Sequence, residues 1–313
     1  MKGLDLAQQF FEICGMPVLQ EQFPDLLPYL AAGLFGMGSE CFGYDDEVSQ
    51  DHDFEPAFCL FLPEEALVDR RKEFLLERAY AKLPREFCGF KREVLMPVGG
   101  ARHGVFRTAE FFQKMLGTED GRLSLLEWLA IPENALAEAT NGRVFYDGFG
   151  ELSRIRATVS YYPEDVRLKR LAGHLLLMEQ AGQYNYMRCI RHGEPEAAQM
   201  AVFEFVRSAL SAVFLLNRVY QPYYKWSFRA LRQLGELNRL SDSFSYLISV
   251  GSDKEDITQK ELRIEFVCSE VRAALSDQGL SFLKDEDLER HAYAVNDSIR
   301  DSQLRNMHIL AAV

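Results

Sequence analysis

The sequence predicts an α+β protein, with a small mixed-sheet domain at residues 1–157 followed by an all-α helical bundle at residues 158–313. Short apolar runs alternate with amphipathic stretches through the first half of the chain, which is typical of strands that alternate with helices. After Tyr162-Pro163 every regular stretch has helical spacing, as in a helical bundle. This change of pattern places the domain boundary near residues 153–163.

Four strands are expected in the first domain. One apolar run ends at a Gly38-Ser39 turn. A second run, FEPAFCLFL, carries Pro56 near its start, where proline favours an edge position or a bulge. Two shorter runs, HGVFRT and RVFY, complete the set, and an Asn141-Gly142 turn precedes the last of them. The expected strands are residues 31–37, 54–62, 103–108 and 143–146.

Helices are predicted where apolar residues recur at three- and four-residue spacing. The longest in the first domain begins at Pro63-Glu64-Glu65, because proline and acidic residues favour a helix N-terminus, and it stops before Pro84. Residues 85–103 have no clear period and are expected to be irregular. The predicted helices are 4–14, 63–82, 109–116, 123–130, 132–140, 164–191, 195–217, 223–238, 242–250, 255–278 and 285–308.

Composition limits the classes of partner. A formal charge of -12 argues against general nucleic-acid binding and is compatible with a cationic partner. No window approaches the roughly 18 consecutive apolar residues of a membrane span. The six cysteines form no Cys-x-x-Cys and are expected to be free thiols, and the N-terminal residues lack the pattern of a signal peptide. We therefore expect a cytoplasmic protein without a nucleic-acid or membrane partner.

The stretch GMGSECFGYDDEVSQDHDF holds two motifs that point to phosphate and metal chemistry. At Gly38-Ser39, the absence of a Cβ lets backbone N–H groups approach an anion, and the serine hydroxyl adds a donor. In a strand, Asp51 and Asp53 would point to the same face, and Mg²⁺ would relieve the repulsion between two such carboxylates. Taken alone, each motif also occurs as an ordinary turn or a solvated loop.

Eleven residues separate Ser39 from Asp51, and both motifs flank strands expected in one sheet. This combination resembles the DNA polymerase beta-like nucleotidyltransferase superfamily. The wider stretch, together with NGRVFYDGFGEL and NRVYQPYYKW, is similar to a bacterial family of nucleotidyltransferase-like proteins known mainly as a domain of unknown function. The aminoglycoside and lincosamide nucleotidyltransferases are more distant and share the layout of a catalytic domain followed by a helical bundle. The resemblance implies that Gly38 and Ser39 hold nucleotide phosphates and that Asp51 and Asp53 are catalytic metal ligands.

A third carboxylate on a neighbouring strand often completes such a site. Glu110, just after the third predicted strand, and Asp147, at the end of the fourth, are the two candidates. Asp147 also fits an ordinary turn, since aspartate is common there. The loop acids Asp45, Asp46 and Glu47 could neutralise a cationic acceptor or lie solvated.

Aromatic and basic residues gather at a helix break in the second domain. Arg218 and Lys225 could meet a triphosphate, and Tyr224 could stack on a base. In the related antibiotic nucleotidyltransferases, basic residues of the helical domain meet the nucleotide. The alternative is an aromatic hinge that packs between helices.

The expected activity is therefore Mg²⁺-dependent transfer of a nucleoside monophosphate, AMP from ATP in the expected case, to a hydroxyl or amine of a small-molecule or protein acceptor. Another NTP is also compatible with the motifs, and the acceptor is not identified by them. The alternative is a nucleotide-binding regulatory or toxin–antitoxin-type protein without efficient turnover.

Overall fold

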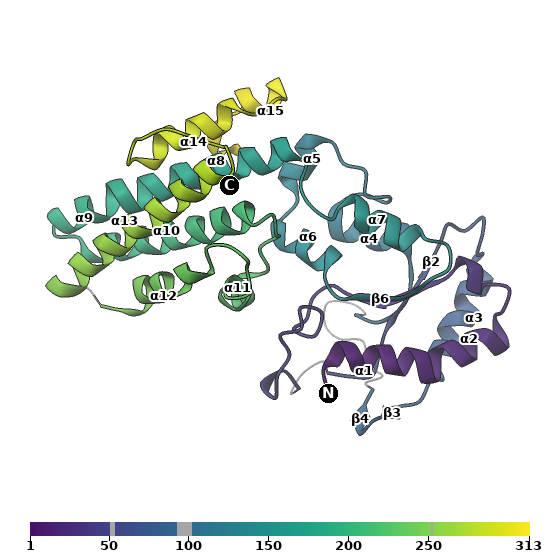
Figure 1. Ribbon diagram of the computed structural model, residues 1–313. Helices are drawn as coiled ribbons and strands as arrows, with labels where there is room; N and C mark the ends of the chain where they lie inside the picture. Colours follow the sequence, from purple (N-terminus) through teal and green to yellow (C-terminus); the bar gives the residue numbers. More distant parts are fainter. Residues whose placement is uncertain (51–53, 93–101, 252) are drawn as a thin grey trace. The chain divides into compact units, whose positions relative to one another are not determined.

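A computed structural model describes residues 1–50, 54–92, 102–251 and 253–313. The chain forms two compact units (Figure 1). The first comprises Met1–Leu123 and Glu133–Ser160, and the second comprises Ser124–Pro132 and Tyr161–Val313. The sequence had predicted a single division between residues 157 and 158, whereas residues 124–132 group with the second unit.

The first unit is built on a mixed four-stranded sheet with the order β5-β2-β1-β6. β1 is antiparallel to both β2 and β6, while β2 and β5 are parallel. The C-terminal end of β1 therefore lies at the same end of the sheet as the N-terminal ends of the other three strands. These strands are β1 (Ala31–Leu34), β2 (Cys59–Leu62), β5 (Gly104–Arg107) and β6 (Arg143–Asp147).

Helices cover both faces of this sheet, because alternate strand residues point to opposite sides. Leu60 and Leu62 of β2 pack in a core with Phe10, Phe58 and Leu76, which brings the N-terminal helices and α3 to one face. Phe61 points to the other face, where its ring lies 5.1 Å from that of Phe111 in α4. The helices of this unit are α1 (Gly3–Phe10), the π-helix η1 (Phe11–Gly15), α2 (Met16–Gln22), η2 (Leu27–Tyr29), η3 (Val48–Gln50), α3 (Arg70–Ala81), α4 (Thr108–Leu116), α6 (Glu133–Thr140) and α7 (Glu151–Thr158).

All regular elements in the described residues of the second unit are helices, with α8 packed against both α10 and α14 (Figure 1). Arg170 of α8 donates to the carbonyls of Leu129 and Ile131, which fixes the segment around α5 within this unit. Its elements are α5 (Leu125–Ala130), α8 (Glu164–Met178), the π-helix η4 (Glu179–Tyr186), α9 (Met187–Arg191), α10 (Pro195–Leu216), α11 (Tyr224–Leu231), η5 (Asn238–Leu240), α12 (Ser241–Ser249), α13 (Lys254–Asp277), α14 (Leu288–Asp297), α15 (Ser302–Asn306) and η6 (Ile309–Ala312).

The α+β class with a mixed sheet and a following helical region is confirmed, but several element boundaries differ from prediction. α3 begins at Arg70 rather than at Pro63, because the Asp69 side chain accepts a hydrogen bond from the Lys72 N–H and caps the helix there. The segment expected to be irregular contains a short hairpin, β3 (Glu86–Phe87) and β4 (Phe90–Lys91). The last predicted helix is divided into α14 and α15, the second of which is capped by Asp301.

One helix within the described ranges, α10, is long and apolar enough to cross a membrane. Of its most apolar window, 67% is buried inside the protein. A buried core helix of a folded protein can have the same length and composition as a membrane-spanning helix.

Candidate functional site

The glycine turn at the end of β1 is fixed by residues that immediately precede β6. Gly36 and Gly38 have φ values of +116° and +127°, which favour glycine and end the strand at Leu34. The Asn141 side chain donates to the Gly36 carbonyl and accepts from the Gly36 N–H, both at 2.9 Å. The predicted Asn141-Gly142 turn therefore also clamps the Gly36–Ser39 segment, which we call the glycine turn.

An ion pair lies against this turn. The Arg102 Nη2 donates to the Met37 carbonyl at 2.7 Å and lies 3.4 Å from the Glu40 Oε1. A Cβ placed on Gly38 would come within 2.6 Å of both the Arg102 Nη2 and the Glu40 Oε2, so these groups fill the space that glycine leaves open. Burial raises the pKa of the Glu40 carboxyl, while its own backbone N–H and the Arg102 charge oppose that increase. The turn thus holds a carboxylate where the sequence predicted an anion.

A second acid–base pair follows from the parallel pairing of β2 and β5. Gly104 lies opposite Cys59, which brings the residues before each strand together. The His103 Nδ1 and the Glu55 Oε1 are hydrogen-bonded at 3.2 Å, with side chains that are only 10% and 18% exposed. The sequence reasoning missed Glu55, although it continues the two-residue spacing of Asp51 and Asp53.

Phe54 and Glu40 approach the same point on α1. A Cβ on Gly3 would lie 2.7 Å from the Glu40 Cβ and 3.0 Å from the Phe54 Cε2. The residues that follow the Asp-x-Asp motif, Phe54 and Glu55, therefore lie beside the glycine turn and its ion pair. Asp51 and Asp53 themselves lie outside the described residues.

Two buried thiols support the backbone on either side of this ion pair. Cys41 donates to the Met37 carbonyl and Cys59 to the Arg102 carbonyl, with sulfur–oxygen distances of 3.9 and 3.4 Å. Burial raises the pKa of Cys59 to about 12 and that of Cys41 well above its usual value. Both side chains therefore remain thiols and act as weak donors rather than nucleophiles.

Within residues 1–50, 54–92, 102–251 and 253–313, no group of three or more His, Cys, Asp or Glu side chains is placed to hold a metal ion. The loop acid Asp45 is buried, accepts from the Gly3 N–H at 2.9 Å and pairs with Lys2. Asp46 accepts from the Ser49 N–H and hydroxyl. The Asp45 contacts hold the acidic loop against α1, and the Asp46 contacts shape its turn.

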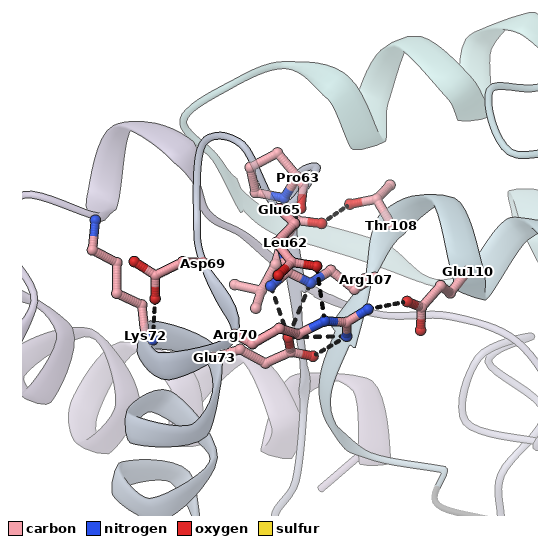
Figure 2. Close-up of polar contacts among 10 residues, drawn as sticks. All are labelled: Leu62, Pro63, Glu65, Asp69, Arg70, Lys72, Glu73, Arg107, Thr108 and Glu110. Atoms are coloured by element: carbon pink, nitrogen blue, oxygen red, sulfur yellow. Dashed lines mark hydrogen bonds and ion pairs between the residues drawn. The ribbon is translucent and has the colours of Figure 1, made fainter.

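Glu110 lies at the opposite end of the sheet from the glycine turn, because it follows the C-terminal end of β5. Figure 2 shows its carboxylate paired with Arg70, at 3.0 Å. Arg70 also contacts Glu73, which binds the buried Arg107 at 2.7 Å. Glu110 is thus part of an ion-pair network that joins α3, β5 and α4.

Asp147 is also distant from the glycine turn. In the antiparallel register of β6 and β1 it pairs with Ala31, the first residue of β1, whereas the turn follows the last. Its two carboxylate oxygens accept from the Gly150 and Ser153 N–H groups, each at 2.8 Å. The structure therefore gives Asp147 the role of an α7 cap and brings neither third-acid candidate to the turn.

Asp147→Ala is expected to lower the free energy of unfolding by about 1–2 kcal/mol, because two N–H groups at the start of α7 lose their acceptor. Urea denaturation followed by circular dichroism measures the change. Asp147→Asn keeps one acceptor oxygen and should lose less stability. A fully stable Asp147→Ala protein would contradict the capping role.

In the second unit, Arg218 is engaged in an ion pair. Its guanidinium binds the Glu164 carboxylate through both oxygens, at 2.8 and 3.1 Å. Glu164 also binds Arg167. The hydrogen bond from Arg167 has the largest effect on the pKa of Glu164 and, together with that from Arg218, lowers it to about 2. Arg218 has a left-handed backbone, with φ of +54°, which directs the chain out of α10.

The other two predicted nucleotide-binding residues lie at the exposed start of α11. Tyr224 is 75% exposed, and its ring lies 4.4 Å from that of Tyr223. The Lys225 Nζ lies 4.9 Å from the centre of the Trp226 ring. Arg218, Tyr224 and Lys225 belong to the second unit, and Gly38 and Ser39 belong to the first.

A comparison with protein families finds one described as "Domain of unknown function (DUF4037)", whose model matches residues 128–227. This segment contains Asp147, Arg218, Tyr224 and Lys225, but not the glycine turn or the Asp-x-Asp motif. None of the curated proteins compared with the chain matches it.

Proposed function

We propose that this protein is a metal-dependent nucleotidyltransferase that moves a nucleoside monophosphate, AMP from ATP in the expected case, to a hydroxyl or amine of an acceptor. The observation that carries the proposal is the glycine turn, where a carboxylate already lies over Gly38 against Arg102. A turn that accommodates one anionic group next to an arginine has the chemistry needed for a phosphate.

The donor chemistry of the Asp-x-Asp motif fits Mg²⁺, which prefers carboxylate and phosphate oxygens. Asp51 and Asp53 would hold the ion, and the described residues that follow them, Phe54 and Glu55, lie beside the glycine turn. Bound Mg²⁺ stabilises negative charge on the attacking and leaving oxygens of a phosphoryl transfer.

The chain's own residues bind and orient the nucleotide in this proposal. Gly38 and Ser39 bind the β- and γ-phosphates, which exposes the α-phosphorus to the acceptor. The acceptor oxygen or nitrogen forms a bond to that phosphorus and loses its proton to water, while the bond to the bridging oxygen breaks and pyrophosphate leaves.

A nucleotide-binding regulatory or toxin–antitoxin-type protein without efficient turnover is the second candidate. The positions of Asp147 and Glu110 favour it, because both expected third carboxylates are engaged at the other end of the sheet. Such a protein would bind ATP with little turnover and would co-purify with a protein partner.

The decisive experiment measures pyrophosphate release from ATP and Mg²⁺ with a panel of small-molecule and protein acceptors, including the protein itself. Asp51→Asn and Asp53→Asn should each reduce the rate by at least about 100-fold, in line with the several kcal/mol that a catalytic metal supplies. Asp120→Asn, which removes one acid from an exposed loop pair with Arg122, is the charge control and should retain the rate.

Thermal unfolding separates the two candidates. Millimolar ATP and Mg²⁺ must raise the melting temperature of either one, because a ligand of the native state stabilises it by mass action. Binding without pyrophosphate release would favour the regulatory protein. Release that persists in both aspartate variants would exclude the proposed metal site.

A further inference from the structure

Glu40 and Arg102 occupy the space where the proposed function requires phosphate. Glu40 and Arg102 are 62 positions apart in the sequence, and Arg102 lies two residues before β5. Their side chains are 13% and 23% exposed, so the pair is largely withdrawn from water. Both residues lie in turns outside the strands, Glu40 after β1 and Arg102 before β5.

The carboxylate stands in for an anionic ligand in three respects. It lies over Gly38, where a Cβ would collide with it, and its own backbone N–H stabilises its charged form. It lies 3.4 Å from the Arg102 Nη2, which also donates to the Met37 carbonyl at 2.7 Å. A carboxylate and a phosphate present similar oxygens to arginine, but a phosphate group carries more acceptors and, within a triphosphate, more charge.

We propose that Arg102 is the phosphate-binding cation of the glycine turn and that Glu40 is an internal anion that holds this position until nucleotide displaces it. This inference rests on the proposed function. Because the turn is competent to bind only when Glu40 has moved away, the apparent affinity is lowered by the fraction of molecules in which it has moved. Glu40 therefore sets a concentration threshold for the nucleotide.

Isothermal titration calorimetry of the full chain tests this with two probes, inorganic triphosphate without metal and ATP with Mg²⁺. Glu40→Gln should bind both probes more tightly, by about 3- to 10-fold, since the competing charge is gone. Arg102→Ala should bind them at least about 10-fold more weakly. Glu65→Gln, which removes one exposed acid from the Arg70 network, controls for net charge and should match the unaltered protein.

The double variant Glu40→Gln with Arg102→Ala identifies the mechanism. If Glu40 acts by competing for Arg102, its removal gives no gain once the arginine is absent, so the double variant should match Arg102→Ala. If Glu40→Gln fails to fold, Glu40→Asp replaces it in the test. This variant keeps the charge on a shorter side chain and should bind more tightly than the unaltered protein. Unchanged or weaker binding in a folded Glu40→Gln or Glu40→Asp protein would overturn the inference.

The two proposals fail in different ways. If pyrophosphate release depends on Asp51 and Asp53 but Glu40→Gln leaves binding unchanged, the internal anion is excluded and the transferase stands. If triphosphate binding follows the expected order while no acceptor yields pyrophosphate, the anion site stands and the transferase is excluded.

Discussion

Gly38→Ala is expected to weaken binding of ATP and Mg²⁺ by roughly 10- to 100-fold, which corresponds to the 1–3 kcal/mol of a strained backbone and a filled space. The added Cβ would lie within 2.6 Å of the Arg102 Nη2 and the Glu40 Oε2, so the ends of both side chains must shift away from Gly38. Titration calorimetry measures the affinity, and circular dichroism checks that the protein is folded.

Gly36→Ala is the matched control for this variant. Gly36 has a φ of +116°, close to the +127° of Gly38, so alanine is strained at both positions. A Cβ on Gly36 would meet only the Met115 Cε, at 3.9 Å. Equal losses of affinity in the two variants would show that backbone strain, rather than the space over Gly38, determines binding.

Glu164→Ala is expected to lower the free energy of unfolding of the second unit by about 2–4 kcal/mol. This is less than the roughly 3–5 kcal/mol of a fully buried ion pair, because the carboxylate is half-exposed. Arg167 is only 1% exposed and would lose its carboxylate partner, at 2.6 Å, while Arg218 would lose its own. Urea denaturation followed by circular dichroism measures the change.

Glu204→Ala provides the comparison, since Glu204 and Arg207 form the same three-residue pair at 2.7 Å with an arginine that is 59% exposed. This variant should lose less than about 1 kcal/mol. The Glu164 contribution should be present above its usual pKa near 4.5 and disappear as the pH falls towards about 2, because the folded protein lowers that pKa. Equal losses of unfolding free energy in Glu164→Ala and Glu204→Ala would show that burial of Arg167 does not increase the stability contributed by its ion pair.

The sequence was sufficient to predict the class of fold and the position of the glycine turn, because apolar runs and glycines are local signals. Strand direction is not local. Asp147 ends a strand just as a catalytic acid would, but its antiparallel pairing with β1 places it beside Ala31. Arg102 meets Glu40 only because β2 lies between β1 and β5, an order that no local pattern encodes.

Side-chain caps account for the boundary errors in a similar way. Pro63 and its acidic neighbours are typical of a helix start, but the Asp69 side chain accepts from the Lys72 N–H and sets the beginning of α3 seven residues later. The choice between two competing starts depends on contacts such as the Arg107 hydrogen bond to the Pro63 carbonyl, which joins this segment to β5.

Residues 124–132 interrupt the first unit in the sequence but belong to the second unit, and this limits how the chain can be divided. The polypeptide leaves the first unit after Leu123, supplies α5 to the second unit, and returns at Glu133 to add β6 and the Asn141 clamp. A ribosome must therefore add Asn141 before the glycine turn can acquire its native hydrogen bonds. No single cut in the sequence yields both units intact, because each unit consists of two separate segments. A fragment that contains only the sheet or only the bundle therefore does not correspond to one continuous stretch of the chain.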